Sequence, residues 1–325
     1  MSPHLRRYGK LGCLTLLALA SYAVSAQALR TTHVVGGIYL ISGAGGNVTI
    51  SVGDSGIMVV DSGSAELSAD LLDAIEAVSD GTIRYVVNTS LHPDHVGGNA
   101  AVRAAGDTFT GGNATVVGGV DEGAAVVGHE SMLMRMAMSS EYGPELQPTE
   151  TFFVPRLDLY FNNEPVEIIY QPNANDDTNV IVHFRRSDVI ATGDVFRLDG
   201  YPVIDLEHGG SIQGVLASLN RLVELAVSDT LAEGGTLIIP GHGRICDEGD
   251  LVRYRDMLTV IRDRVQAWID RGDSLSEIKR AGPSFEYDSR YGATRGEWTT
   301  EMFIEAVYAS LMADAERERL SSAAN

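Results

Sequence analysis

The chain has 325 residues and an acidic composition, with 44 Asp and Glu against 24 Lys and Arg and a formal net charge of −20 at pH 7. Such a surface repels phosphate backbones, so we exclude nucleic acid as a partner and expect a small-molecule substrate instead. Only Cys246 lies outside the first 28 residues, so the rest of the chain cannot form an internal disulfide.

Residues 1–28 have the pattern of a secretory signal peptide. Arg6, Arg7 and Lys10 form a basic start, residues 11–24 are apolar, and the small residues of VSAQA follow. A membrane anchor is the alternative, but the apolar run is short for a span and its ending favours cleavage. We therefore expect a periplasmic or secreted protein with no stable membrane span after cleavage.

The first half of the remaining chain mixes strand and helix patterns. Residues 36–63 are rich in β-branched side chains with glycine breaks, which predicts three short strands in hairpin succession. The apolar spacing then predicts a helix over 64–80 with Ser64 as its cap, a strand over 82–88 and a short helix over 99–105. A longer helix carrying four methionines is predicted over 122–138.

The second half repeats the order of strands first and helices later. Strands are predicted over 157–170, 179–184, 188–194 and 236–243, and helices over 211–227, 250–269 and 298–320. No repeat and no linker divides the chain. This order predicts one α/β domain over 29–325, in which helices cover sheets and a helical extension occupies about 248–318.

Four segments place side chains that can bind a metal next to the end of a predicted strand. They hold His92, Asp94 and His95; Asn175, Asp176 and Asp177; Asp194; and His242. A divalent ion needs imidazoles and carboxylates that converge at roughly 2.0–2.2 Å, and loops at strand ends are where a rigid scaffold positions such groups. Neighbouring glycines permit the tight turns that this convergence requires. Together the segments predict a metal site.

The order of these segments resembles the metallo-β-lactamase fold superfamily, from about residue 33 to at least 245. That family carries His-x-His-x-Asp-His after a strand, then a histidine, then an aspartate in a Gly-Asp pair, then a histidine in a Pro-Gly-His-Gly-like turn. The resemblance implies an αβ/βα four-layer sandwich with the site at one edge of two sheets. It also implies a metallo-hydrolase that binds up to two ions, usually zinc, with iron or manganese as alternatives.

Two positions depart from the family pattern. Ser90 lies where the family has its first histidine, and Asn175 lies where it has its middle histidine. The first metal site that the resemblance implies therefore keeps only His92, a weaker ligand, and the bridging Asp194. The second site is intact and consists of Asp94, His95, Asp194 and His242.

Three interpretations of these substitutions remain open. In the first, the protein is an exported hydrolase of an amide, ester, lactone or thioester with one metal, and β-lactams are among the candidate substrates. Asp94 and His92 are then the catalytic residues, with His92 as general base and Asn175 as a candidate donor to an oxyanion. In the second, Ser90 and Asn175 are weak oxygen ligands of a labile second ion. In the third, the site is degenerate and the protein is a ligand-binding or scaffold protein.

The loop over 196–210 is predicted to form the edge of the substrate pocket. Tyr201 and Pro202 are its candidate substrate contacts, and His208 is a candidate to line the pocket. Neither the substrate nor the oligomeric state follows from the sequence.

Overall fold

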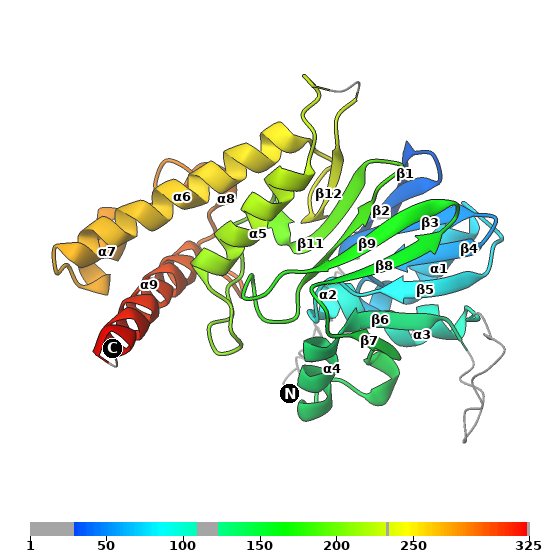
Figure 1. Ribbon diagram of the computed structural model, residues 1–325, viewed down its shortest axis with the longest axis horizontal. Coiled ribbons are helices and arrows are strands. Elements are labelled where there is room, and N and C mark those ends of the chain that lie inside the picture. Colours follow the sequence, from blue (N-terminus) through cyan, green and yellow to red (C-terminus); the bar gives the residue numbers. More distant parts are fainter. Residues whose placement is uncertain (1–28, 109–122, 232–233, 324–325) are drawn as a thin grey trace, which may run out of the picture.

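The computed structural model describes residues 29–108, 123–231 and 234–323, so the predicted signal peptide lies outside the described residues. Its strands form a seven-stranded sheet in the order β1 to β7 and a five-stranded sheet in the order β12-β11-β10-β9-β8 (Figure 1). The first sheet comprises β1 (Arg30–Val35), β2 (Ile38–Ala44), β3 (Gly46–Gly53), β4 (Gly56–Val60), β5 (Ile83–Val87), β6 (Ala125–His129) and β7 (Glu150–Phe152). The second comprises β8 (Arg156–Phe161), β9 (Glu164–Tyr170), β10 (Val180–Phe184), β11 (Val189–Arg197) and β12 (Leu237–His242).

The helices of the described residues lie between and after these strands. The first half contains η1 (Ala65–Leu67), α1 (Ser68–Glu76), α2 (Pro93–Val96), α3 (Asn99–Ala104), α4 (Glu130–Met138) and η2 (Pro144–Leu146). The second half contains α5 (Ile212–Leu225), α6 (Glu248–Asp270), α7 (Leu275–Ala281), α8 (Asp288–Tyr291) and α9 (Thr300–Ala323). None of these helices combines the length and the apolar composition that a membrane crossing requires.

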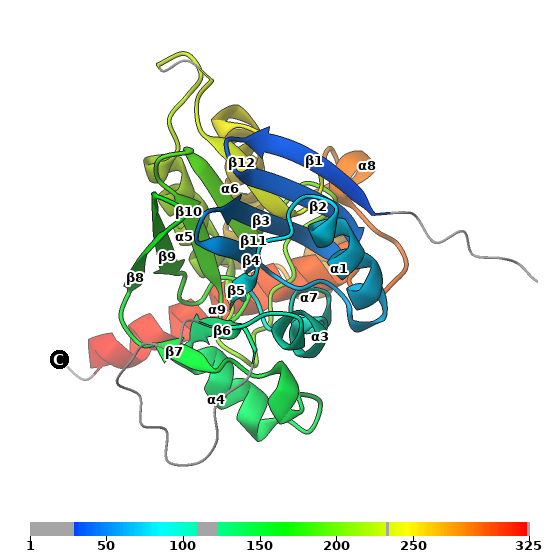
Figure 2. The same ribbon diagram turned by 90° about the vertical axis from the view of Figure 1, so that its right-hand side faces the viewer.

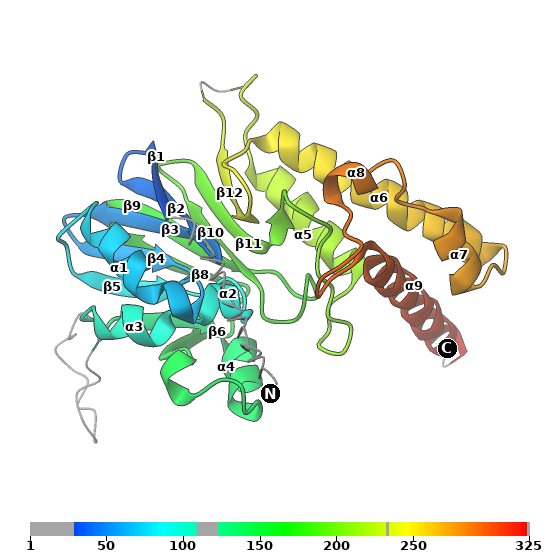
Figure 3. The ribbon, with the colours of Figure 1, turned by 180° about the vertical axis from the view of Figure 1, so that it is seen from behind.

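Buried side chains divide the molecule into four layers. Leu40 and Met58 of the first sheet pack against Ile168 and Val182 of the second, so the two sheets face each other. The outer face of the first sheet packs against α1 and α3. Figure 2 shows these helices on one side of that sheet and β8 to β10 on the other, and Figure 3 shows the helices from behind.

The fourth layer consists of helices on the outer face of the second sheet. Ile181 and Ile190 of that sheet share one core with α5, α6 and α9. The molecule is therefore a mixed α/β fold with the predicted αβ/βα four-layer sandwich, and this prediction is confirmed. Beyond the sheets, α6, α7 and α9 extend to one side (Figure 1).

The predicted helix over 122–138 is wrong in its first part. Residues Ala125–His129 form the buried strand β6, which pairs in parallel with β5, and only Glu130–Met138 are helical. A short apolar run does not distinguish a buried strand from a helix by its periodicity, and the four methionines favoured a helix. Of these methionines, Met132 and Met136 are buried, whereas Met138 is 82 % exposed.

Candidate metal centre

The four predicted segments meet at one edge of the two sheets. β5 leads into residues 88–92 and then into α2, which carries Asp94 and His95, and His242 is the last residue of β12. The two sheets are tied together at this edge by Asn47 of β3. Its Nδ2 donates hydrogen bonds of 2.9 Å to the carbonyl oxygens of Pro240 and Gly243, on either side of His242.

Asp194 lies within its strand rather than after it, because β11 continues to Arg197. The pairing of β11 with β12 shifts register around Gly193, whose φ of +51° is a left-handed conformation. A Cβ atom at Gly193 would lie 2.1 Å from Oγ1 of Thr89. Glycine is therefore required here by both conformation and space, and the resulting irregularity directs Asp194 toward the site.

Three side chains form a group of potential metal ligands, because the donor atoms of Asp94, His95 and His242 all lie within 4.8 Å of one another. Nε2 of His242 is 3.0 Å from Oδ2 of Asp94, and Nε2 of His95 is 3.9 Å from the same oxygen. Oδ1 of Asp194 lies 3.2 Å from Nε2 of His95 and 3.5 Å from Nε2 of His242. The structure thus brings together all four residues predicted for the second site.

These spacings fit a divalent ion. Ligands about 2.1 Å from a tetrahedral ion are separated from one another by about 3.4 Å, which lies within the range of the four separations. Nε2 of His95 and Oδ1 of Asp194 are buried and make no hydrogen bond of acceptable geometry with any described residue. Buried polar atoms without partners are costly, and an ion bound by both would satisfy them.

Asp61 orients His95 and was not predicted as a site residue. Its Oδ2 lies 2.8 Å from Nδ1 of His95, so that nitrogen donates its proton to Asp61 and Nε2 is the nitrogen that faces the other candidate ligands. The same carboxylate accepts hydrogen bonds from the backbone N–H and Oγ1 of Thr89. The signal in the sequence is an aspartate directly after the apolar strand IMVV, in a Ser-Gly turn that also suits a simple loop.

Charges within the centre shift the pKa values of its ionisable groups. Burial acts to lower the pKa of His95, but the carboxylates of Asp194 and Asp61 outweigh burial and raise this pKa well above its usual value. Burial acts to raise the pKa of Asp194, and the neighbouring His95 and His92 reverse this and hold it well below its usual range. The centre therefore stabilises an ionised carboxylate and positive charge beside it, which is the arrangement that a cation requires.

His92 contacts the centre without belonging to its ligand group. Its Nδ1 lies 2.5 Å from Oδ2 of Asp194, and its side chain is 25 % exposed. Burial acts to lower the pKa of His92, but the hydrogen bond to Asp194 and the charge of that residue outweigh burial and raise it. His92 thus lies between the candidate metal ligands and the surface.

Ser90 and Asn175 are buried and are engaged with the backbone. Ser90 Oγ accepts a hydrogen bond of 3.3 Å from the N–H of His92, and Asn175 Nδ2 donates one of 2.7 Å to the carbonyl oxygen of Val203. One N–H of the Asn175 amide is directed at Val203 and the residue is only 1 % exposed, so its role as a donor to an oxyanion stays a prediction. Its Oδ1 is buried and has no partner among the described residues.

The other residues of the second segment lie outside the ligand group. Asp176 is buried and accepts hydrogen bonds from the N–H and Oγ1 of Thr178, which closes the turn in which it lies. Asp177 forms an ion pair of 2.8 Å with Arg135 of α4. Both carboxylates therefore stabilise the loop.

Tyr201 is a core residue and not the predicted substrate contact. It is 2 % exposed, its ring stacks on Phe303 of α9, and its hydroxyl donates to Asp288. It also borders a cavity of about 120 Å³, which none of the candidate metal ligands lines. Tyr201 was predicted at a surface because the loop around it is rich in Gly, Pro and Asp, whereas packing of the distant C-terminal helix covers it.

His208 does lie in an exposed turn, but its ring forms an ion pair with Asp205 of the same turn. Its carbonyl oxygen accepts a hydrogen bond from Arg135. The residues that precede it, from Val203 to Glu207, line a cavity together with His92, whereas His208 does not. Residues 203–207 thus border a cavity and His208 does not, whereas contact of this segment with a substrate stays a prediction.

Comparison with known proteins identifies the family. The sequence profile of the Metallo-beta-lactamase superfamily matches residues 42–242, which is more than half of the chain and includes every candidate ligand. The chain belongs to the metallo-β-lactamase superfamily. The predicted family is thereby confirmed, and the members of this superfamily are generally metallo-hydrolases.

Individual members of the superfamily are only distantly similar. A metallo-beta-lactamase type 2 from Bacillus sp. (strain 170) is 22 % identical over 215 residues, which cover 62 % of this chain and 68 % of that protein. The solved metallo-beta-lactamase from Pontibacter korlensis has a TM-score of 0.54 and 17 % identity, and the match covers 71 % of this chain and 99 % of that one.

The match to another solved structure covers more of the chain. The stereoselective inverting sec-alkylsulfatase Pisa1 from Pseudomonas sp. has a TM-score of 0.60 and 16 % identity, and the match covers 86 % of this chain but 50 % of that one. The chain thus spans half the length of this alkylsulfatase. At such identities the solved structures show a shared fold, and the substrate has to be inferred from this chain's own residues.

Proposed function

We propose that this member of the metallo-β-lactamase superfamily is an exported hydrolase of a small amide, ester, lactone or thioester, with one divalent ion, zinc first, in the Asp94 centre. The observation that carries this proposal is the convergence of four donor atoms, four of whose separations are 3.0–3.9 Å and two of which are buried without a hydrogen bond of acceptable geometry. Asp94, His95, Asp194 and His242 would hold the ion.

The state of the first site supports one ion rather than two. Ser90 and Asn175 lie where the family has two histidines, so His92 is the only imidazole left at the first site. A neutral hydroxyl and an amide are also weaker ligands for zinc than the imidazoles that they replace. The first site is therefore expected to lack affinity, while the second keeps its complete ligand set.

An ion in the Asp94 centre would act as a Lewis acid toward the attacking water and the scissile carbonyl group. The chain itself supplies the proton transfer. His92 donates its Nδ1–H to Asp194, so its Nε2 carries the lone pair that a general base requires. His92 then accepts a proton from the water and returns it to the leaving group, while Asp194 holds the ring in one orientation. The carboxylate of Asp94, which is 31 % exposed, can orient the water by accepting a hydrogen bond.

The proposed location and substrate size rest on other features. The basic start, the apolar run and the small residues of 1–28 support export to the periplasm or beyond the cell. The acidic net charge supports a small molecule over a nucleic acid as the substrate.

Metal analysis of the purified chain tests the proposal. We expect about one equivalent of zinc, iron or manganese after purification with these metals present, and loss of the metal from Asp94→Ala and His242→Ala. In the same two variants, kcat/KM on a panel of amides, lactones, esters and thioesters should fall by at least about a hundredfold. His33→Ala, which removes an exposed histidine of β1, is the matched control and should change neither quantity.

Two outcomes would contradict the proposal in different ways. Metal content below about a tenth of an equivalent would exclude the metal centre. One equivalent of metal without turnover of any substrate on the panel would instead favour a ligand-binding or scaffold protein that keeps an inactive centre.

A further inference from the structure

A cavity of about 580 Å³ lies beside His92, between residues 203–207 and the C-terminal helix α9. Its walls are apolar on both sides, with Ile204 and Leu206 on the loop and Met302 and Ala306 on α9. The volume lies within the range of about 300–1,000 Å³ that small-molecule sites occupy. Because His92 contacts Asp194, the cavity adjoins the metal centre at the residue proposed to transfer the proton.

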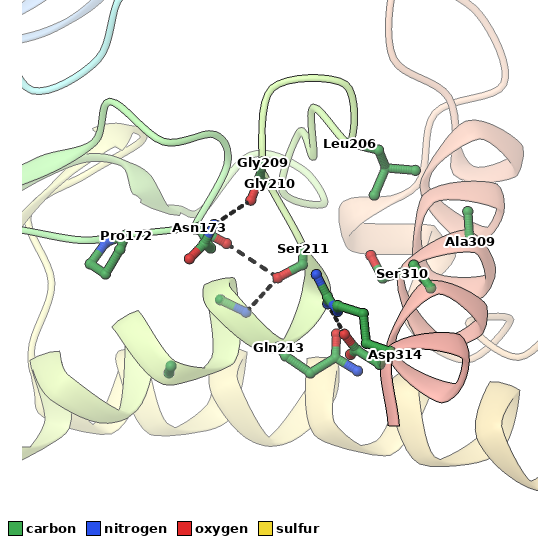
Figure 4. A pocket seen from close by; sticks show the side chains of 14 residues that line it. Pro172, Asn173, Leu206, Gly209, Gly210, Ser211, Gln213, Ala309, Ser310 and Asp314 are labelled. Atoms are coloured by element: carbon green, nitrogen blue, oxygen red, sulfur yellow. Dashed lines mark hydrogen bonds and ion pairs between the residues drawn. The ribbon is translucent and has the colours of Figure 1, made fainter. Parts of the chain in front are cut away.

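A neighbouring cavity of about 640 Å³ at the start of α5 lacks this connection, because neither His92 nor any candidate metal ligand lines it. Two of its polar side chains are also hydrogen-bonded to backbone groups of the same lining, as Figure 4 shows. Asn173 Nδ2 donates to the carbonyl oxygen of Gly209, and Ser211 Oγ accepts from the N–H of Gly214. Leu206 and Ala309 line both cavities, so the two adjoin along α9.

Apart from His92, the ionisable groups that line this cavity are acidic. Asp205, Glu207 and Glu305 line it, and no lysine or arginine does. Asp205 is paired with His208, and Glu305 with Lys279. The carboxylate of Glu207 has no ion-pair or hydrogen-bond partner among the described residues. An anionic group in this cavity would therefore be repelled, while an uncharged apolar group would be favoured.

We propose that this cavity binds the non-reacting part of the substrate, and that this part is a large apolar group without negative charge. The proposal rests on the function proposed above, and it names the substrate class as hydrophobic acyl or aryl compounds. One wall of the cavity comes from outside the family match, which ends at residue 242, because α9 begins at Thr300. The C-terminal helix thus adds substrate selectivity to a centre built by the shared fold.

Steady-state kinetics on matched esters test the selectivity. With the metal-loaded chain, p-nitrophenyl octanoate should have a kcat/KM about tenfold or more above that of the acetate, and the anionic hemiester of succinate should be the poorest substrate. Ala309→Trp, which fills the cavity, should reduce the preference for octanoate to about threefold or less. An unchanged preference in this variant would overturn the proposal.

A binding measurement keeps the proposal testable without turnover. We expect the uncharged fluorophore N-phenyl-1-naphthylamine to bind the chain more tightly than the anionic 1-anilinonaphthalene-8-sulfonate. Ala309→Trp should weaken the binding of the uncharged fluorophore. Glu207→Lys should strengthen the binding of the anionic fluorophore by about threefold or more. Glu301→Lys makes the same charge change on α9 outside this cavity and is the control.

The two proposals fail separately in these experiments. If no ester is hydrolysed but the variants change binding as stated, the hydrolase function is wrong and the cavity remains a ligand site. If esters are hydrolysed but Glu207→Lys and Glu301→Lys have equal effects on the binding of the anionic probe, the cavity is not the site that selects the substrate.

Discussion

At the scale of single residues, the pair formed by Asp61 and His95 controls how the centre presents its buried imidazole. Asp61 accepts the Nδ1 proton of His95 at 2.8 Å and itself adopts a left-handed conformation with φ of 64°. Asparagine tolerates that conformation, so Asp61→Asn removes the charge without straining the backbone. Losing such a carboxylate behind a metal-binding histidine costs about 10- to 100-fold in metal affinity.

We therefore expect Asp61→Asn to weaken zinc binding by about 10- to 100-fold, as measured by competition with a chromogenic chelator. Asp177→Asn is the control, because it removes a carboxylate that pairs with Arg135 away from the centre. Equal zinc affinity in wild type and Asp61→Asn would mean that Asp61 only shapes the loop.

His92 offers a second test at this scale, because a ligand and a general base respond differently to substitution. His92→Gln removes the proton acceptor and leaves Asp94, His95, Asp194 and His242 unchanged. We expect kcat to fall by about 10²- to 10⁴-fold while metal content stays at about one equivalent. Metal analysis of the sample used for kinetics separates the two roles, and loss of the ion would show that His92 is a ligand.

The residues of the metal centre could be predicted where the residue type alone indicates metal binding. His95, Asp94 and His242 stand out because imidazoles and carboxylates next to glycines have few other reasons to recur at strand ends. Asp61 was missed because an aspartate in a Ser-Gly turn is equally typical of a loop. Tyr201 was misplaced because its burial depends on Phe303, about a hundred residues away in sequence.

At the scale of elements, the helices and strands with strong sequence patterns were predicted, whereas the short strand β6 was not. Nearly continuous apolar residues in β10 and the helical spacing of α5 match the structure closely. β6 was mistaken for helix because its four apolar or small residues fit either period, and its pairing with β5 is a non-local contact. Local sequence propensity does not predict secondary structure that depends on such tertiary pairing.

The start of α6 provides a prediction at the element scale. The carboxylate of Asp250 is 6 % exposed and lies 2.7 Å from both Arg244 and Arg253. Burial acts to raise the pKa of Asp250, but its hydrogen bonds to the two arginines outweigh burial and hold this pKa below its usual value. Because both arginines are largely exposed to solvent, we expect Asp250→Asn to lower the free energy of unfolding by about 1–2 kcal/mol at pH 7.

The sign of the pH dependence follows from the lowered pKa of Asp250. The stabilisation is complete above the pKa of an unfolded aspartate, about 3.9, and is lost as the pH falls through the lower folded value. Urea denaturation at pH 7 and pH 3 should therefore show a smaller difference between wild type and Asp250→Asn at pH 3. Asp263→Asn on the exposed face of the same helix is the control, and a similar loss in both variants would contradict the prediction.

At the scale of the whole molecule, the four layers followed from the family resemblance and not from periodicity alone. The alternation of strands and helices predicts an α/β domain, but it does not say which strands share a sheet. Neither the family resemblance nor the alternation of strands and helices predicted the position of α9. Its contacts with α5 and α6 are set by packing of apolar faces that are distant in sequence. The cavity beside His92 could not be predicted for the same reason.

The C-terminal helices and the five-stranded sheet share one core, so we expect them to unfold together as one unit. Phe303 of α9 is fully buried, stacks on Tyr201 with ring centroids 4.4 Å apart, and belongs to the core that contains Ile190 of β11 and Leu258 of α6. Phe303→Ala should cost about 3–5 kcal/mol and lower the Tm of one cooperative transition in calorimetry. Met312→Ala, on an exposed part of the same helix, should have little effect. Two separable transitions, with only one shifted by Phe303→Ala, would show instead that the helices unfold independently of the sheets.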